Sequence, residues 1–395
     1  MKKSVSILGV TGSVGQSAQE IILSAPDRFD VQVLTAGRNA KSLAESAIKL
    51  KARKAVIADE SQLDLLRGLL SGHGIDVACG AGAIIESAAE KADVVLAAIV
   101  GIAGLRPILK ALEQGTHVAI ANKEPLVAAG PLVMEKARKH GAKILPVDSE
   151  HNAIFQVFEE RNRAYIDKII LTASGGPFLS RSYEAMATVT PAQAIAHPNW
   201  TMGRKISVDS ATMMNKALEI IEAHYLFGMP PEDIDVVIHP QSVVHSMVSY
   251  VDGSVLSQMG ASDMRTPITY ALSWPDRTES SGDKLDISSV CDLHFENPDF
   301  EQFPCLSFAY ECLERGQAAC VALNAANEVA VADFLDDRIG FLDIQDAIRH
   351  ALDTFEDLHS IKTLKTVEKI EELDKTVREI TQGYTSRVMQ ERKSA

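Results

Sequence analysis

Residues 4–15 read SVSILGVTGSVG, a short β-branched run that passes directly into a glycine-rich turn. The glycines, Gly9, Gly12 and Gly15, have GxxGxxG spacing rather than the commoner GxGxxG. Glycines permit a sharp turn and a close backbone approach to a pyrophosphate, which N–H groups at the start of a helix then bind. Because a strand precedes the turn and an amphipathic helix to about Leu23 follows it, the stretch predicts a dinucleotide site. An ordinary tight turn between strand and helix is the alternative.

The rest of the first third of the chain alternates between strand-like and helix-like segments with short connections. Expected strands cover residues 29–35, 54–58, 93–99, 116–121 and 143–147, and expected helices cover residues 105–114 and 131–140. Repeated alternation of this kind is typical of a doubly wound parallel sheet with helices on both faces. We therefore predict an α/β fold with a Rossmann-like, cofactor-binding domain over residues 1–147.

The chain after residue 147 follows a different pattern. Strand-like runs at residues 168–173, 236–239, 243–251 and 254–258 surround one helix expected at about 211–225. The pair Asp252-Gly253 between two of these runs predicts a hairpin. We expect a central α+β catalytic domain over residues 148–275, a linker over 276–304 and a C-terminal helical domain over 305–395.

The composition excludes several classes of protein. The chain has 395 residues and a formal net charge of -14, which argues against a nucleic-acid-binding protein because such proteins need a basic surface. Five cysteines, an odd number without CxxC spacing, argue against a disulfide framework or a structural zinc site. The sequence shows neither a signal peptide nor an apolar run long enough to span a membrane. We expect a soluble, cytoplasmic protein.

The end of the second expected strand bears on the choice of cofactor. NAD sites usually carry an acidic residue there for the ribose 2′-hydroxyl, whereas a 2′-phosphate needs cations and hydrogen-bond donors. This chain has Gly37, Arg38 and Asn39, followed by Lys41 and Ser42, and no acidic residue at this strand end. The segment favours NADP, and a solvated arginine in a loop is the alternative.

Two acidic residues, Asp148 and Glu150, follow the last expected strand of the first domain. If that strand continues, their side chains point to one face at the carboxyl end of a parallel sheet, where such sheets bind ligands. A divalent cation that prefers oxygen ligands, Mg²⁺ or Mn²⁺, would neutralise the pair. A general acid/base pair is the chemical alternative, and capping of a helix by Asp148 or Ser149 is the structural one.

A second polar cluster lies in the segment DSATMMNKALE, which ends at Glu219. On one helix, Asn215, Lys216 and Glu219 would share a face. Glu219 would complete a three-carboxylate metal site, with Glu222 as a rival ligand one turn further on. Ser210, Asn215 and Lys216 are donors of the kind that bind a phosphate. A surface salt bridge between Lys216 and Glu219 is the alternative.

Two loops complete the candidate site. SGGPF, which begins at Ser174, is a small-residue loop with a hydroxyl that suits a phosphate. HPNWTMG, from His197 to Gly203, combines a polar group, the large aromatic Trp200 and a terminal glycine. This combination suits a lid that excludes water from a bound substrate. A histidine before a proline is usually structural, and that is the alternative.

Together these segments resemble the 1-deoxy-D-xylulose 5-phosphate reductoisomerase family over almost the whole chain. The resemblance rests on GVTGSVG, AGRN, ANKEPLV, PVDSEH, SGGPF, HPNWTMGRKISVDSATMMNKALE, IHPQSVVHSM and NAANEVAV. The long central block, from His197 to Glu219, is the most specific of them. Arg38 stands where several relatives carry lysine, and Val14 where isoleucine is common; we expect neither difference to affect activity.

The resemblance implies a homodimeric, NADPH-dependent oxidoreductase that uses Mg²⁺ or Mn²⁺ in the non-mevalonate route to isoprenoid precursors. The metal-bound 1-deoxy-D-xylulose 5-phosphate would be rearranged by retro-aldol and aldol steps. Hydride transfer from NADPH would then give 2-C-methyl-D-erythritol 4-phosphate.

The resemblance also implies roles for individual residues. The metal ligands would be Asp148, Glu150 and Glu219, which together with Lys123 form the catalytic set. Substrate contacts would come from Lys123, Ser149, Glu150, Ser174, His197, Trp200, Ser210, Asn215, Lys216 and Glu219. NADPH contacts would come from Thr11, Gly12, Ser13, Val14, Gly37, Arg38, Asn39, Asn122, Glu124 and Gly203.

Two other classes of protein share parts of this pattern. A semialdehyde-type NADP dehydrogenase has a similar turn but needs a nucleophilic cysteine near the nicotinamide. No cysteine lies between Cys79 and Cys291, which weighs against that class. A non-catalytic NADP sensor would not need three carboxylates and a phosphate-binding set.

Overall fold

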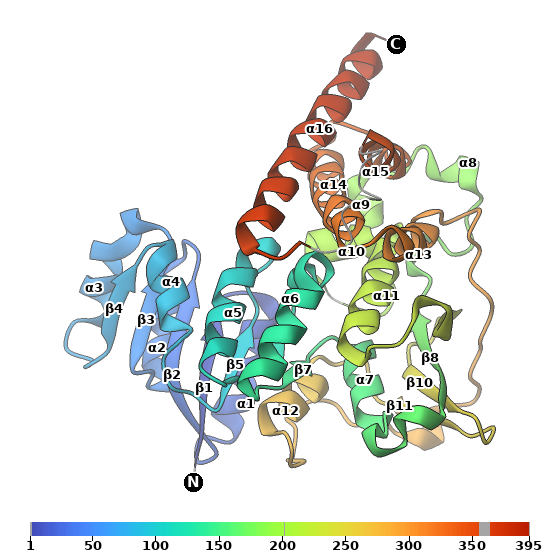
Figure 1. Ribbon diagram of the computed structural model, residues 1–395. Coiled ribbons are helices and arrows are strands. Elements are labelled where there is room, and N and C mark those ends of the chain that lie inside the picture. The colour runs from blue at the N-terminus through green and yellow to red at the C-terminus, as the bar shows by residue number, and fades with distance from the viewer. Residues whose placement is uncertain (1, 201, 355–363, 395) are drawn as a thin grey trace. The chain divides into compact units, whose positions relative to one another are not determined.

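The computed structural model describes residues 2–200, 202–354 and 364–394. The chain divides into two compact units, each built from several segments and each with a sheet of its own (Figure 1). Unit 1 comprises Met1–Pro125, Val133–Gln156 and Asp263–Leu285, and unit 2 comprises Leu126–Leu132, Val157–Ser262 and Asp286–Ala395.

Unit 1 is built on a seven-stranded parallel sheet with strand order β4-β3-β2-β1-β5-β6-β7. Its strands are β1 (Lys3–Leu8), β2 (Phe29–Ala36), β3 (Lys54–Ile57), β4 (Asp76–Cys79), β5 (Val94–Ala97), β6 (His117–Ile120) and β7 (Ile144–Pro146). Strands β2 to β4 are added on one side of β1 and strands β5 to β7 on the other, so the strand order reverses between β1 and β5. Sheets of this type bind ligands at that switch point. The expected doubly wound α/β sheet is confirmed.

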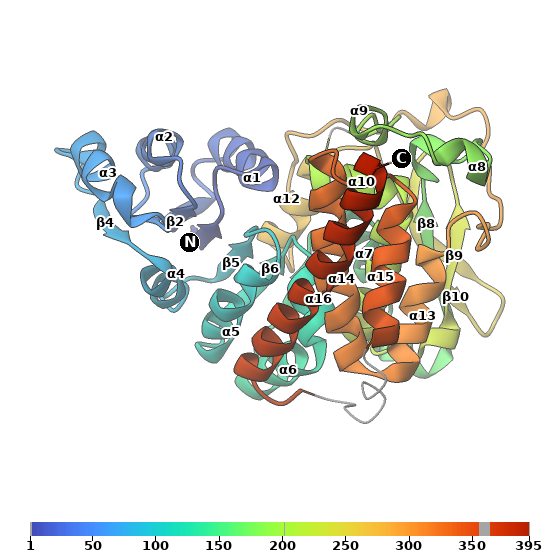
Figure 2. The same cartoon turned by 90° about the horizontal axis from the view of Figure 1, so that it is seen from above.

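Helices cover both faces of this sheet. Figure 2 shows α1, α2 and α3 on one side and α4 and α5 on the other. The helices of unit 1 include α1 (Ser13–Ser24), α2 (Ala40–Leu50), η1 (Glu60–Gln62), α3 (Leu63–Leu70), α4 (Ala81–Ser87), η2 (Ile102–Gly104), α5 (Leu105–Glu113) and α12 (Arg265–Ser273). In α1 the buried positions Gly15, Ala18 and Ile22 recur at helical spacing, so one face of the helix packs on the core.

Two elements of the N-terminal region differ from expectation. Strand β4 was not expected, because its sequence DVAC is short, partly exposed and at the edge of the sheet. Helix α6 (Glu124–His140) begins at Glu124 rather than at the expected Pro131. Pro131 lies inside the helix, where it lacks an N–H, and Ala129 leaves the helical region with φ -134° and ψ 23°. The proline therefore marks an interruption of α6 and not its first turn.

Unit 2 contains a four-stranded mixed sheet with strand order β11-β10-β8-β9. Its strands are β8 (Ile166–Ala173), β9 (Ile234–Ile238), β10 (Val244–Tyr250) and β11 (Val255–Met259). β8 is parallel to β9 and antiparallel to β10, and β10 and β11 form the hairpin expected at Asp252-Gly253. The expected second sheet, of mixed type, is confirmed.

The rest of unit 2 is largely helical. Its helices include η3 (Glu160–Tyr165), η4 (Gly176–Phe178), α8 (Tyr183–Met186), α9 (Pro191–Ala194), α10 (Arg204–Ala211), α11 (Met214–Phe227), η5 (Pro231–Asp233), η6 (Ile287–Ser289), α13 (Cys305–Arg315), α14 (Gln317–Leu335), α15 (Asp343–Thr354) and α16 (Val367–Ser394). The C-terminal helices pack on α14, which contacts α13, α15 and α16. Among the described residues α14 has the length and hydropathy of a membrane span, but 78% of that stretch is buried, as in the core helix of a soluble protein.

The helix expected at about residues 211–225 is α11, and a further helix, α10, precedes it and is separated from it at Thr212 and Met213. Met213 has φ 60° and ψ 9°, a left-handed conformation that is uncommon for a residue other than glycine. The segment DSATMMNKALE, from Asp209 to Glu219, crosses this break and is therefore not one continuous helix. Ser210 and Lys216 therefore lie on different helices.

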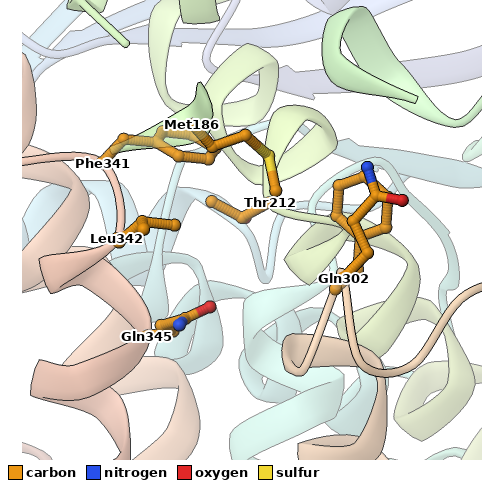
Figure 3. A pocket seen from close by; sticks show the side chains of 7 residues that line it. Met186, Thr212, Gln302, Phe341, Leu342 and Gln345 are labelled. Carbon is orange, nitrogen blue, oxygen red and sulfur yellow. The ribbon is translucent and has the colours of Figure 1, made fainter. Parts of the chain in front are cut away.

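A small pocket opens in unit 2 (Figure 3). Its lining side chains are Met186, Thr212, Gln302, Phe303, Phe341, Leu342 and Gln345. Its volume of about 10 Å³ suits about one water molecule. A pocket of this size cannot hold a sugar phosphate or a dinucleotide, so it is not the candidate site.

Candidate active site

The glycine-rich turn lies between β1 and α1, at the switch point of the unit 1 sheet. Gly9 has φ 92°, and a Cβ there would lie 2.5 Å from the carbonyl oxygen of Ala98. A Cβ on Gly15 would lie 2.5 Å from the carbonyl oxygens of both Gly9 and Val10. Gly12 is the N-cap of α1, whose first-turn N–H groups have no acceptor within the helix. This close-packed turn at a helix N-terminus fits a pyrophosphate.

Arg38 and Asn39 follow β2 at the same edge of the sheet. The Asn39 side chain caps α2 by accepting a hydrogen bond from the Ser42 N–H at 3.0 Å. The Arg38 side chain is 90% exposed, and its Nε lies 3.6 Å from Oδ2 of Asp59. Hydrogen bonds from the hydroxyl and the N–H of Ser61 lower the pKa of the Asp59 carboxyl. β2 itself ends without an acid, as expected, but the fold supplies one from the end of β3.

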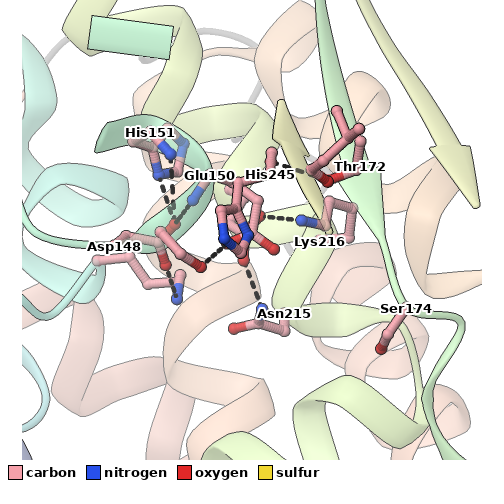
Figure 4. Close-up of polar contacts among 12 residues, drawn as sticks. Asp148, Glu150, His151, Thr172, Ser174, Asn215, Lys216 and His245 are labelled. Atoms are coloured by element: carbon pink, nitrogen blue, oxygen red, sulfur yellow. Dashed lines mark hydrogen bonds and ion pairs between the residues drawn. The ribbon is translucent and has the colours of Figure 1, made fainter. Parts of the chain in front are cut away.

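Lys123 and Asp148 form an ion pair at the carboxyl ends of β6 and β7. Lys123 is buried, and its Nζ lies 3.1 Å from Oδ2 of Asp148. The other carboxylate oxygen, Oδ1, lies 3.1 Å from Nδ1 of the fully buried His151. In Figure 4 the side chains of Asp148 and His151 point toward one another. Contacts at both oxygens fix the orientation of this carboxylate.

Asp148 and Glu150 do not lie on a continued strand, so that expectation is wrong. β7 ends at Pro146, and helix α7 (Ser149–Val157) begins almost at once. Oδ1 of Asp148 accepts a hydrogen bond from the Glu150 N–H at 3.2 Å, the helix-capping contact that was the structural alternative. The reason is that a carboxylate can satisfy N–H groups left without acceptors at a helix start. The Ser149 hydroxyl donates to the Glu150 carboxylate.

The polar side chains of α11 are enclosed and do not lie on the surface. Lys216 is 2% exposed and Glu219 is fully buried. Lys216 donates to Oε2 of Glu219 and Asn215 donates to Oε1; Figure 4 labels the two donor side chains, each with a dashed line from its nitrogen. The alternative interpretation, a surface salt bridge between Lys216 and Glu219, is therefore wrong. Taking two charges out of water is costly, so such a pair is a poor device for stability alone.

Ser174 and His197 form a hydrogen-bonded pair in unit 2. Oγ of Ser174 lies 3.0 Å from Nε2 of His197 and accepts a bond from the Gly176 N–H at 3.2 Å. Nδ1 of His197 accepts from the N–H groups of Asn199 and Trp200 at 3.1 and 3.0 Å. Nδ1 is therefore the unprotonated nitrogen of the neutral ring, and Nε2 donates to Ser174. The hydroxyl hydrogen of Ser174 then remains for donation to an anion.

The loop that carries Ser174 approaches the helix that carries Ser210. Gly176 has φ 67°, and a Cβ there would lie 2.6 Å from the carbonyl oxygen of Ser210. Such an approach requires glycine at this position. The close contact places two hydroxyl-bearing segments, far apart in the sequence, side by side in unit 2.

The expected lid, residues 197–203, is tied to the loop between β9 and β10. Nδ2 of Asn199 donates to the carbonyl oxygen of Pro240 at 2.6 Å and to Oγ of Ser242 at 3.2 Å. Thr201 lies outside the described residues. These contacts anchor the segment at Asn199, while its opening and closing remain a prediction.

The other predicted cofactor contacts also lie at strand ends or helix starts. Thr11, Gly12, Ser13 and Val14 follow β1; Gly37, Arg38 and Asn39 follow β2; Asn122 and Glu124 follow β6; and Gly203 is the N-cap of α10.

Two residues of the site had no role in the sequence interpretation, His151 and Asp59. His151 is signalled by its spacing of three from Asp148 at a helix start, and Asp59 by being the first acid after β3.

Three family models match the chain. The models described as 1-deoxy-D-xylulose 5-phosphate reductoisomerase, its C-terminal domain, and DXP reductoisomerase C-terminal domain match residues 5–130, 144–227 and 259–380 respectively. The 1-deoxy-D-xylulose 5-phosphate reductoisomerase of Zymomonas mobilis is 52% identical over 353 residues, which are 89% of this chain and 91% of that protein. The enzyme of the same name from Rhodospirillum centenum is 56% identical over 350 residues, 89% of this chain and 87% of that protein.

Solved structures are similar over nearly the whole chain. The reductoisomerase from Zymomonas mobilis in complex with NADPH has a TM-score of 0.92 and 47% identity, over 98% of this chain and 99% of that one. A DOX-P reductoisomerase in complex with NADPH, fosmidomycin and magnesium has a TM-score of 0.92 and 41% identity, over 98% and 99%. Those two proteins bind a dinucleotide, and the second also binds a divalent cation.

Proposed function

Because this chain belongs to the 1-deoxy-D-xylulose 5-phosphate reductoisomerase family, we propose that the residues described above form the active site for that reaction. The enzyme converts 1-deoxy-D-xylulose 5-phosphate to 2-C-methyl-D-erythritol 4-phosphate with NADPH and magnesium, in the non-mevalonate route to isoprenoid precursors. The main support for this assignment is the buried ion pair of Lys216 and Glu219. Because burying two charges costs desolvation free energy, a contribution to stability does not explain why the pair is buried.

NADPH binds to the N-terminal sheet, and all of its proposed contacts except Gly203 lie in the domain expected over residues 1–147. The turn between β1 and α1 holds the pyrophosphate, because it has no room for side chains at Gly9 and Gly15 and ends in a helix N-terminus. Arg38 meets the 2′-phosphate as an exposed cation. The full proposed set is Thr11, Gly12, Ser13, Val14, Gly37, Arg38, Asn39, Asn122, Glu124 and Gly203. When bound, NADPH supplies the hydride that reduces the substrate.

The substrate phosphate binds in unit 2. Ser174 donates the hydroxyl hydrogen that its contact with His197 leaves for an anion. Ser210 and Asn215 add neutral donors, and Lys216 adds a positive charge in an enclosed site where electrostatic attraction is strong. Ser149 contacts the substrate from α7, and Trp200 on the lid excludes water from it. The phosphate is remote from the reacting carbons, so its binding energy can serve orientation of the reacting end.

Asp148, Glu150 and Glu219 are the proposed metal ligands. Three carboxylates offer the hard oxygen donors that Mg²⁺ and Mn²⁺ prefer. Glu222, which is also buried, is the alternative acid on α11. When bound, the cation polarises substrate oxygens as a Lewis acid. The protein orients two of the ligands in advance, through the contacts at both oxygens of Asp148 and of Glu219.

Lys123 serves the reacting end of the substrate in this proposal. Its ammonium group is held 3.1 Å from Asp148 at the carboxyl edge of the sheet, where sheets of this type bind ligands. From there it donates a hydrogen bond to a substrate oxygen and stabilises negative charge that develops on it.

We further propose that the enzyme is a cytoplasmic homodimer. Strand β11 is an edge strand, and the side chains of Val251, Val255 and Leu256 on its hairpin are exposed. Exposed apolar strand edges are usually covered. Light scattering coupled to gel filtration should give twice the mass of 42.7 kDa; a monomer across the working concentration range would contradict this part of the proposal.

The test of the function is the oxidation of NADPH by purified protein, followed by its absorbance. Oxidation should require both 1-deoxy-D-xylulose 5-phosphate and Mg²⁺ or Mn²⁺, and should stop when EDTA is added. Restoring excess metal should restore the rate, which separates metal removal from unfolding. Full activity in EDTA would rule out the metal role. Binding of NADPH without any turnover of the sugar phosphate would indicate a sensor and not an enzyme.

A further inference from the structure

A buried carboxylate, Asp209, lies on α10 directly beside Ser210. Oδ1 of Asp209 accepts a hydrogen bond from Nδ2 of Asn327 at 2.9 Å, and Oδ2 lies 2.9 Å from Nζ of Lys205. Burial, and then the charge on Asp209, raise the pKa of the nearby Cys305 thiol to about 12. Contacts at both oxygens hold this carboxylate in one orientation within unit 2.

Asn327 reaches Asp209 from α14, across 118 residues of sequence. Asn327 is fully buried, and its Oδ1 has no hydrogen-bond partner in the described part of the chain. A buried polar atom without a partner destabilises a protein, and an apolar residue of similar size would avoid that cost. The placement of an amide here is therefore explained by the bond to Asp209 and not by packing.

The helix that carries Asp209 determines where α11 begins. The two helices meet at Met213, a non-glycine residue with φ 60°. Such a conformation costs free energy and persists only where the surroundings fix it. Oγ1 of Thr212 contributes by bonding to the carbonyl oxygen of Asp209 at 3.2 Å and to the Met214 N–H at 3.3 Å. A shift of α10 would therefore be passed to the first turn of α11.

We propose that Asp209 and Asn327 are positioning residues for the phosphate-binding side chains of this enzyme. Their hydrogen bond holds α10 in place against α14. It therefore determines the position of Ser210, which lies on α10, and the position of Lys216, which lies on α11 beyond the break at Met213. The inference rests on the proposed function, in which Ser210 and Lys216 bind the substrate phosphate. Neither member of the pair touches the substrate; both act through their neighbours on α10 and α11.

The variant Asn327→Ala tests the pair, and Asn324→Ala is its matched control. Asn324 lies on the same helix, is equally buried and also has an Oδ1 without a partner among the described residues, but its amide donates to Glu328 at 3.2 Å. Both variants remove a buried amide and should lower the melting temperature similarly. Asn327→Ala alone should raise the KM for 1-deoxy-D-xylulose 5-phosphate, by about tenfold, because small misplacements of binding groups are costly. Its affinity for NADPH should stay at the wild-type value.

An exchange variant provides a rescue. Asp209→Asn combined with Asn327→Asp reverses the donor and the acceptor of the hydrogen bond and still leaves an oxygen for Lys205. We expect this double variant to have a KM within about threefold of the wild type. Asn327→Asp alone places two buried carboxylates together, so its KM should exceed that of the double variant. If Asn327→Ala does not fold, the exchange variant still tests whether the hydrogen bond positions the phosphate-binding side chains.

Equal KM values for Asn327→Ala and Asn324→Ala would overturn the inference, as would a folded exchange variant that stays as impaired as Asn327→Asp. Ser210→Ala separates this failure from failure of the proposed function. An unchanged KM in Ser210→Ala would refute the phosphate site itself. A raised KM in Ser210→Ala with no effect of Asn327→Ala would refute only the positioning role.

Discussion

Replacing Gly15 with alanine tests the cofactor turn most directly. Gly15 lies in the first turn of α1, where a helical alanine would ordinarily be favourable. At this site, however, the new Cβ would lie 2.5 Å from the carbonyl oxygens of Gly9 and Val10 and 2.6 Å from the carbonyl carbon of Val10. All three atoms belong to the backbone, so no side chain can rotate away to make room.

The size of the effect follows from this geometry. Ordinary contact begins at 3.4 Å, so each oxygen is about 0.9 Å too close (3.4 Å less 2.5 Å) and α1 must move away from the turn. Overpacking typically costs about 1–3 kcal/mol, and the rigid neighbours favour the upper end of that range. The same movement displaces the first-turn N–H groups from the pyrophosphate. We expect the Kd for NADPH to rise at least about tenfold, equivalent to about 1.4 kcal/mol.

Gly82→Ala is the control, because Gly82 lies in α4 with nothing within 4 Å of its Cβ position. The control should be neutral or more stable by up to about 1 kcal/mol. The free energy of unfolding is measured in urea, and the Kd for NADPH by nucleotide fluorescence. Gly15→Ala should lower the free energy of unfolding, whereas Gly82→Ala should not. Wild-type stability and wild-type NADPH affinity in Gly15→Ala would refute the reasoning.

Three further substitutions test the proposed roles. Glu219→Gln should lower kcat by at least about a hundredfold, because a metal ligand is lost, while the Kd for NADPH stays near the wild-type value; a large loss of NADPH binding would count against the assignment. Lys216→Ala should raise the substrate KM about tenfold or more, as expected for loss of a charge-assisted hydrogen bond; an unchanged KM would mean that Lys216 only balances Glu219. Asp59→Asn should lower the Kd for NADPH by no more than about fivefold, because the acid near Arg38 is lost from an exposed site, and should leave the Kd for NADH unchanged; equal effects on both cofactors would contradict it.

The sequence predicted what depends on local pattern. The turn at Gly9 and the hairpin at Gly253 follow from spacing within a few residues, and the parallel sheet follows from the alternation of strand-like and helix-like segments along the first third of the chain. The break at Met213 was not predicted, because apolar residues continue through it and a methionine rarely adopts a left-handed conformation. The burial of Lys216 was equally hidden, since lysine and glutamate three residues apart have the same spacing on a surface and in a core.

Other parts of the site depend on residues that are distant in the chain. Asp59 reaches Arg38 only because β2 and β3 are neighbours in the sheet. Asn327 reaches Asp209 only because α14 packs against α10. Neither segment carries a local signal for its partner, and a single sequence contains no other record of long-range contact.

In the proposed site, a lysine of the same unit accompanies each of two acids that bind the metal. Lys123 is paired with Asp148 and Lys216 with Glu219. With a cation bound to these carboxylates, the ammonium groups of Lys123 and Lys216 would be repelled from them and would become available to substrate oxygens. The net charge of -14 makes such a local source of positive charge necessary for an anionic substrate. Metal binding and phosphate binding should therefore reinforce one another.

This coupling can be measured with inorganic phosphate, which probes the phosphate site without chelation by the sugar. Because coupling is reciprocal, magnesium should tighten phosphate binding by the factor with which phosphate tightens magnesium binding, and typical couplings are about 5- to 150-fold. Calorimetric titration of phosphate with and without excess magnesium gives the factor for the wild type. In Lys216→Ala the factor should fall toward one, because the charge that magnesium would release is gone. The wild-type enzyme could instead bind phosphate equally well with and without magnesium. That result would show that Lys216 is available to phosphate before the metal binds, and that its pairing with Glu219 has no part in substrate binding.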